Sequence, residues 1–307
     1  MLHRPWSTPL VVGFWCVTTG WLVVSKILPT FESGTPPETA GVVAAVDRLV
    51  PVGWTVSWNG NPIGWAVMQS RRSADGGLSV ESRLHCDRLP LDEVLPAWAG
   101  ALMKRTLPAG RANELDASGR ILFDPSNRLR SFVSTVTLPG AAERVVLAGR
   151  AKEADLVEVS FHAGDLRYET TRRIPAHAML GDELSPQAML PGLYEGRRWT
   201  LPVYSPLRPG RAPLQILHAR VDGEETIFWG DRLVIARVVS YREDPSSTRE
   251  PRCRLWVDRS GKVLRHESAI LGAKMEFVRR SDAEAARLAA TAALEETAAD
   301  QPREATP

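Results

Sequence analysis

The chain has 307 residues, of which 44% are hydrophobic and 24% are charged, and its net charge is +2. The hydrophobic fraction is sufficient for a sizeable core, over a length that fits an anchor plus one large domain or two small ones. The near-neutral charge excludes a protein that binds nucleic acid through its overall positive charge.

The first 31 residues contain an uncharged stretch from Trp6 to Ser25. Its 20 residues are about the number that one helix needs to cross a bilayer. We therefore predict an N-terminal transmembrane anchor over 1–31, with the helix itself near 8–28. A cleaved signal peptide is the main alternative, but no Ala-x-Ala cleavage site follows the stretch.

The charges that flank this stretch indicate its orientation. Arg4 and the terminal amine lie before it, whereas Lys26 follows it and the next positive charge is Arg48. Positive charges concentrate on the cytoplasmic side of membrane helices. We therefore expect a single-pass membrane protein whose C-terminal domain lies outside the cytoplasm, in the periplasm or beyond.

After the anchor, a stretch rich in Pro, Gly and Thr predicts a linker over 32–45, and a short helix is expected over 42–50. The next segment, 46–280, is predicted to be an antiparallel β domain. Apolar and polar residues alternate in Leu78–Cys86 and again in Val157–Phe161, as in strands with one buried face. Apolar residues three and four apart predict one longer helix, near 91–106.

Two hairpins are marked by their turn residues. Strands at 54–58 and 63–69 flank Asn59–Pro62, and strands around Leu255–Leu264 flank a turn at Asp258–Gly261. In the second hairpin we expect Leu255 and Val257 on one face and Trp256 on the other. Further strands are predicted at 198–204, 214–221, 226–229, 233–241, 252–258, 262–271 and 274–279. The tail, 281–307, is predicted to be helical or disordered.

No pattern in the sequence carries catalytic chemistry. His85-Cys86-Asp87 combines reactive residue types, but on a strand Cys86 points away from both neighbours. The six histidines have neither the helical spacing nor the cysteine neighbours of a zinc site. We therefore predict no enzyme, and assign no catalytic, cofactor-binding or metal residues and no cofactor.

The cysteines, tryptophans and arginines each leave two interpretations open. Cys86 and Cys253 form a disulfide in an oxidising compartment, or remain two core thiols. Seven of the ten tryptophans lie after the anchor, as ligand-binding platforms or as core side chains. Of the 38 basic residues, 33 are arginines, which bind phosphate or carboxylate groups or are simply solvated.

Four short motifs carry a family resemblance. They are Trp58–Trp65, Leu190–Gly192, Gly196–Tyr204 and Leu255–Arg265, the last with the pattern Trp-x-Asp, Gly, x-Val-Leu. Together, over about 54–280, they resemble bacterial cell-envelope domains of unknown function. These domains are similar to the periplasmic lipoprotein-carrier (Lol-type) fold. The resemblance implies a curved antiparallel sheet partly covered by one or two helices, and it assigns no catalytic residues.

These features lead to a functional hypothesis. We expect a membrane-anchored extracytoplasmic binding domain whose partner is an apolar or lipid ligand or an envelope protein. The alternative is a structural or interaction protein of an envelope assembly, without a small ligand. An open apolar cavity on the concave face of the sheet would favour the lipid ligand, and a closed core would count against it.

Overall fold

The computed structural model describes residues 7–24, 34, 36–37, 50–88, 114–126, 128–137, 144–153, 156–173, 179–180, 186–204, 214–270 and 273–300. The predicted helix near 91–106, and all but Val50 of the predicted helix over 42–50, lie outside these residues. Most of the predicted linker and the end of the tail, from 301 on, also lie outside them.

Within the described residues, fifteen strands form one sheet in the order β8-β7-β6-β5-β4-β3-β2-β1-β15-β14-β13-β12-β11-β10-β9. Every neighbouring pair is antiparallel except β9 and β10, which are parallel. The predicted mainly β class and antiparallel sheet are thus confirmed. The strands are β1 Val52–Trp58, β2 Asn61–Arg72, β3 Leu78–Cys86, β4 Leu115–Phe123, β5 Leu129–Thr137, β6 Val145–Ala151, β7 Leu156–Ala163, β8 Leu166–Arg173, β9 Met179–Leu180, β10 Arg198–Tyr204, β11 Leu214–Trp229, β12 Arg232–Arg242, β13 Cys253–Val257, β14 Val263–Ile270 and β15 Ala273–Arg279.

Tight turns connect most neighbouring strands, as the turn residues predict. Asn59 and Gly60 both have positive φ, of 47° and 82°, which a two-residue hairpin turn between β1 and β2 requires. Gly261 has a φ of 86° in the predicted turn between β13 and β14. Asp258 accepts hydrogen bonds from the backbone N–H groups of Ser260 and Lys262, at 2.8 and 2.9 Å. Both predicted hairpins are therefore confirmed.

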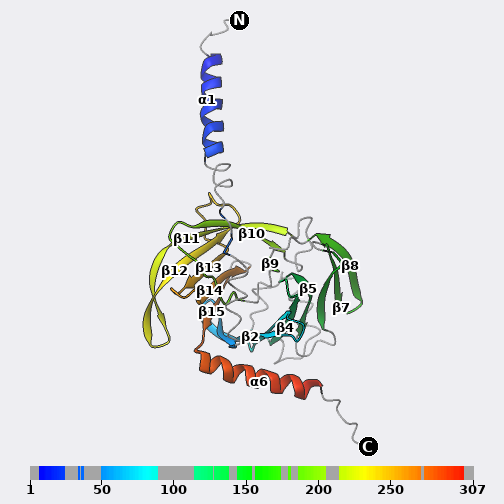
Figure 1. Ribbon diagram of the computed structural model, residues 1–307. Coiled ribbons are helices and arrows are strands. Elements are labelled where there is room, and N and C mark those ends of the chain that lie inside the picture. Colours follow the sequence, from blue (N-terminus) through cyan, green and yellow to red (C-terminus); the bar gives the residue numbers. More distant parts are fainter. Residues whose placement is uncertain are drawn as a thin grey trace, which may run out of the picture.

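The sheet curls strongly, and its concave face encloses the main core (Figure 1). On β1 the buried Trp54 and Val56 point to this face, where they meet Met275 and Phe277 of β15. The core cluster also takes side chains from β2, β3, β4, β10, β11, β12, β13 and β14. A void of about 10 Å³ beside Trp54 has room for roughly one water molecule.

One helix covers the opposite face of β1 and β2. It is α6, Asp282–Asp300, which lies across the sheet in Figure 1. Ser281 and Glu284 form a capping box, in which the Ser281 N–H donates to Glu284 at 3.1 Å and the Glu284 N–H donates back to Ser281. Ala285 lies against Gly53, and Ala289 packs on Val67. Of the two states predicted for the tail, helical or disordered, the structure has a helix over Asp282–Asp300, and small alanine side chains bring it close to the sheet.

A second helix, α1, covers Ser7–Leu22 and stands clear of the sheet in Figure 1. In the part of the chain that the structure describes, no helix has both the length and the apolar content needed to cross a membrane. Residues 25–28 of the predicted span lie outside the described residues, so the anchor stays a prediction.

Candidate functional site

The catalytic-looking triplet on β3 is divided between two faces of the sheet, as expected. Cys86 is fully buried in the main core, and burial raises the pKa of its thiol to about 12. His85 points the other way and contacts two carboxylates, Asp116 at 2.8 Å from Nδ1 and Asp87 at 3.0 Å from Nε2. Partial burial lowers the pKa of His85, but the two hydrogen bonds together outweigh this effect. The pKa of His85 is therefore raised above its ordinary value. Because both ring nitrogens are engaged, His85 has no free nitrogen to act as a base.

A second Cys–His pair lies inside the core. His266 Nε2 is 3.1 Å from Cys253 Sγ and 2.9 Å from Ser268 Oγ, and His266 Nδ1 has no hydrogen-bond partner. Burial lowers the pKa of His266 to about 4 and raises that of Cys253 to about 12. Both groups are therefore neutral at pH 7, and the histidine does not activate the thiol. Cys86 and Cys253 are both free thiols. The structure therefore agrees with two separate core thiols and not with a disulfide.

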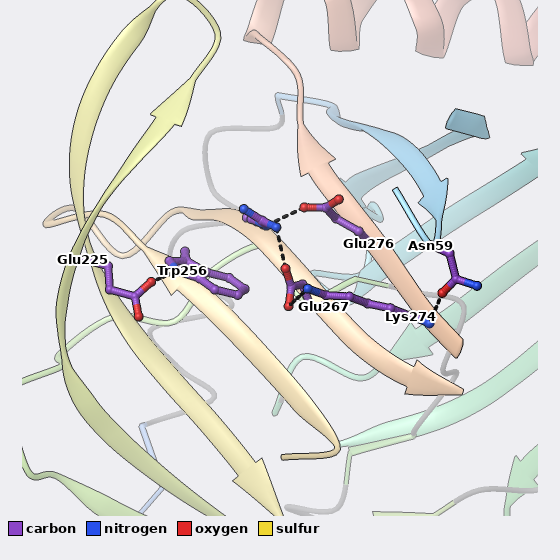
Figure 2. Close-up of polar contacts among 7 residues, drawn as sticks. Asn59, Glu225, Trp256, Glu267, Lys274 and Glu276 are labelled. Atoms are coloured by element: carbon purple, nitrogen blue, oxygen red, sulfur yellow. Dashed lines mark hydrogen bonds and ion pairs between the residues drawn. The ribbon is translucent and has the colours of Figure 1, made fainter. Parts of the chain in front are cut away.

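The most developed polar cluster lies on the opposite face of β13, β14 and β15 (Figure 2). Arg265 stacks on Trp256, with the guanidinium carbon 4.8 Å from the ring centre. Its guanidinium forms ion pairs with Glu276 and with Glu267, the latter at 2.5 Å. Lys274 Nζ adds a contact of 2.7 Å to the second oxygen of Glu267, whose side chain is 8% exposed. The cluster is internally neutralised, with two cations and two carboxylates.

This cluster supports the long β11–β12 hairpin. A bulge between Val221 and Gly223 redirects the hairpin. Trp256 Nε1 then donates a hydrogen bond of 2.8 Å to Glu225, as Figure 2 shows. Nearer the turn, Trp229 Nε1 donates to the backbone carbonyl of Arg279 at 2.7 Å. One face of the hairpin is thus fixed to β13 and β15.

The other face of this hairpin is apolar and open to solvent. Phe228 is 75% exposed, Leu233 is 61% exposed and Ile235 is 46% exposed. Phe228 and Leu233 are register partners, and Ile235 is two residues further along the same face of β12. We call these three residues the hairpin face. A contiguous apolar surface on a rigid element is typical of an interaction site.

Sequence reasoning identified the strands that carry these groups but not the groups themselves. The side chains of Arg265, Glu267, Lys274 and Glu276 lie on one face of β14 and β15. The available signal was the two-residue spacing of opposite charges on each strand. Trp54, Trp58, Trp199 and Trp256 are buried, in agreement with the core interpretation of the tryptophans. Over the described ranges, no three His, Cys, Asp or Glu side chains converge as they would around a metal ion.

No protein-family model matches the chain, and no curated protein matches it. Among solved structures, it is similar to the "Beta-barrel-like Protein of Domain of Unknown Function DUF1849 from Brucella abortus". The identity is 9% and the TM-score is 0.43, over 76% of this chain and 97% of that one. The Lol-type fold and the envelope location stay predictions.

Proposed function

We propose that the chain is a membrane-anchored extracytoplasmic domain that binds an envelope protein through the hairpin face. The observation that carries the proposal is the side-by-side exposure of Phe228 and Leu233 on a hairpin whose other face is fixed. Because Trp229 and Glu225 are already hydrogen-bonded, the hairpin is ordered before any partner arrives. Little conformational entropy is then lost when a partner covers the hairpin face.

The position of the hairpin face favours a protein partner over the anchoring membrane. The N-terminal segment reaches the sheet at Gly34, which bridges to Trp199 of β10, and Trp199 pairs with Ala219 of β11. Phe228 lies nine residues further along β11, roughly 30 Å away at about 3.3 Å per residue. In Figure 1 the turn of this hairpin lies at the end of the body away from α1. The hairpin face is thus displaced from the side on which the anchor joins.

Two features support the membrane-anchored topology. The apolar side chains of α1 are open, with Phe14 and Val17 each 70% exposed and Trp15 65% exposed. Such side chains are costly in water and favourable in lipid. The flanking charges, Arg4 before the stretch and Lys26 after it, favour a cytoplasmic N-terminus. Protease added to intact spheroplasts is expected to degrade the body, and protection of the body would reverse the orientation.

The packing of the concave face bears on the choice of partner. A Lol-type carrier that holds a lipid chain inside the sheet needs an apolar cavity. Beside Trp54, the void on the concave face holds only about one water molecule. A void of this size has no room for a lipid chain, so the described packing around Trp54 supports the protein-binding form of the hypothesis.

Site-specific photocrosslinking in membranes tests the proposal. A photoreactive amino acid in place of Phe228 is expected to give a discrete protein adduct. The matched control is Leu166, which is 62% exposed near the edge of the sheet on β8 and is expected to give none. Adducts with phospholipid alone at position 228, or equal protein adducts at both positions, would refute docking through the hairpin face.

A further inference from the structure

A pocket of about 350 Å³ opens on β10, β11 and β12, and four of its lining residues are basic. They are Arg198, His218, Arg220 and Arg242. Arg198 pairs with Arg220 across β10 and β11, and His218 pairs with Arg242 across β11 and β12. Because register partners point to the same face, the three guanidinium groups surround one cavity.

Two of the described carboxylates, those of Asp222 and Asp244, lie near these cations. Asp222 is part of the lining, and its Oδ1 lies 3.7 Å from Arg220 Nε, beyond hydrogen-bonding distance. Burial lowers the pKa of His218, and the nearby Asp244 raises it in part. Among the described residues that line the pocket, three are arginines and one, Asp222, carries a carboxylate. A lining this rich in basic side chains favours an anionic ligand.

A short loop closes one side of the pocket. Arg242 Nη1 donates hydrogen bonds to the backbone carbonyls of Arg249 and of Ser247, the latter at 3.2 Å. This brings Ser246 and Ser247 into the lining, beside the arginines. Guanidinium and hydroxyl groups are both suitable partners for phosphate oxygens, and guanidinium binds them through two parallel hydrogen bonds.

We propose that this pocket binds a phosphate group. Its volume is in the range of small-ligand sites and exceeds that needed for a bare phosphate, so a phosphorylated glycerol or similar group fits the space. The pocket lies where the N-terminal segment joins the body, because the Gly34 N–H donates to the carbonyl of Arg198 at 3.0 Å and Val24 is part of the lining. The ligand is a phospholipid headgroup or a soluble phosphate compound. Only the lipid source depends on the proposed membrane anchor.

Calorimetric titration of the full chain in a non-ionic detergent tests phosphate binding. One arm adds inorganic phosphate or glycerol phosphate. The other adds detergent micelles that carry phosphatidylglycerol, with phosphatidylcholine micelles as the zwitterionic comparison. Arg220→Gln is expected to weaken binding about 10-fold, the effect of losing one charged hydrogen bond. The side chain of Arg220 is 57% exposed, so its replacement leaves the core intact.

Arg120 provides a matched control. Its side chain is also 57% exposed and also contacts one carboxylate, Glu81, but on β4. Arg120→Gln is expected to leave binding unchanged, and Arg198→Gln is expected to weaken it as Arg220→Gln does. Binding of soluble phosphate or of phosphatidylglycerol alone, with this pattern of variants, supports the site and identifies its source. Absence of binding in both arms, or equal loss in Arg120→Gln, would overturn the proposal, whatever partner the hairpin face has.

Discussion

Replacement of the buried His266 by glutamine is expected to remove a large part of the acid sensitivity of the fold. The ring is buried against Phe277 and has a pKa of about 4, compared with an ordinary value of 6.5. Between these two pH values the unfolded chain binds a proton at this position that the folded chain does not. Stability from this group is therefore fully present above pH 6.5 and is lost as the pH falls toward 4.

The shift of about 2.5 pH units corresponds to about 3 kcal/mol, of which about 2 kcal/mol is lost by pH 5. Urea unfolding at pH 5 and pH 7.5, followed by tryptophan fluorescence, measures this loss for the parent and for His266→Gln. Carboxylates titrate in both proteins, so the difference between the two losses isolates His266. We expect the variant to lose about 2 kcal/mol less than the parent between these pH values. Parallel losses would refute a neutral, buried His266.

Three further predictions concern local features of the fold. Gly261→Val is expected to destabilise the protein by about 2 kcal/mol, because φ at this position is positive and an added Cβ would lie 2.9 Å from the Cα of Pro191. Urea unfolding measures the change, and a midpoint equal to that of the parent would contradict the prediction. Because the pKa of His85 is raised, protonated His85 stabilises the folded state fully below pH 6.5. This stabilisation is lost as the pH rises through the pKa of the folded protein. Asp116→Asn is therefore expected to reduce the change in unfolding free energy between pH 6 and 8. An unchanged pH dependence would show that the His85–Asp116 contact does not contribute to stability. Ser281→Ala removes the N-cap of α6 at a cost of about 1 kcal/mol, so faster hydrogen exchange is expected within α6 and not in β7.

The sequence predicts those parts of the fold in which local chemistry and final structure agree. In the β13–β14 hairpin, Leu255 and Val257 join the main core while Trp256 packs on the opposite face, as the alternation requires. The Asn59-Gly60 turn is equally local, since its two positive φ angles favour these residue types. Such features depend on a few neighbouring residues, which is why sequence reasoning identifies them.

The strands between residues 115 and 151 show why other parts escaped prediction. Gly149 lies beneath the ring of Phe132, and an added Cβ would lie 2.1 Å from a ring carbon. The glycine is needed for packing across β5 and β6, but within its own segment it weakens the strand pattern. The docking of α6 through alanines, and the gathering of Arg198, His218 and Arg220 around one pocket, likewise depend on tertiary contacts. No local pattern contains that information.

The pairing of β1 with β15 has a consequence for how the polypeptide folds. Trp54 is the register partner of Arg279, so the centre of the sheet joins segments 225 residues apart. Closing so long a loop costs a large amount of chain entropy before the contacts between β1 and β15 can form. Topologies of this kind therefore fold slowly. During synthesis the main core cannot be completed until β15 has emerged. Until then β1 and β14 each present an unpaired edge, so a chain truncated before residue 273 would expose two templates for aggregation.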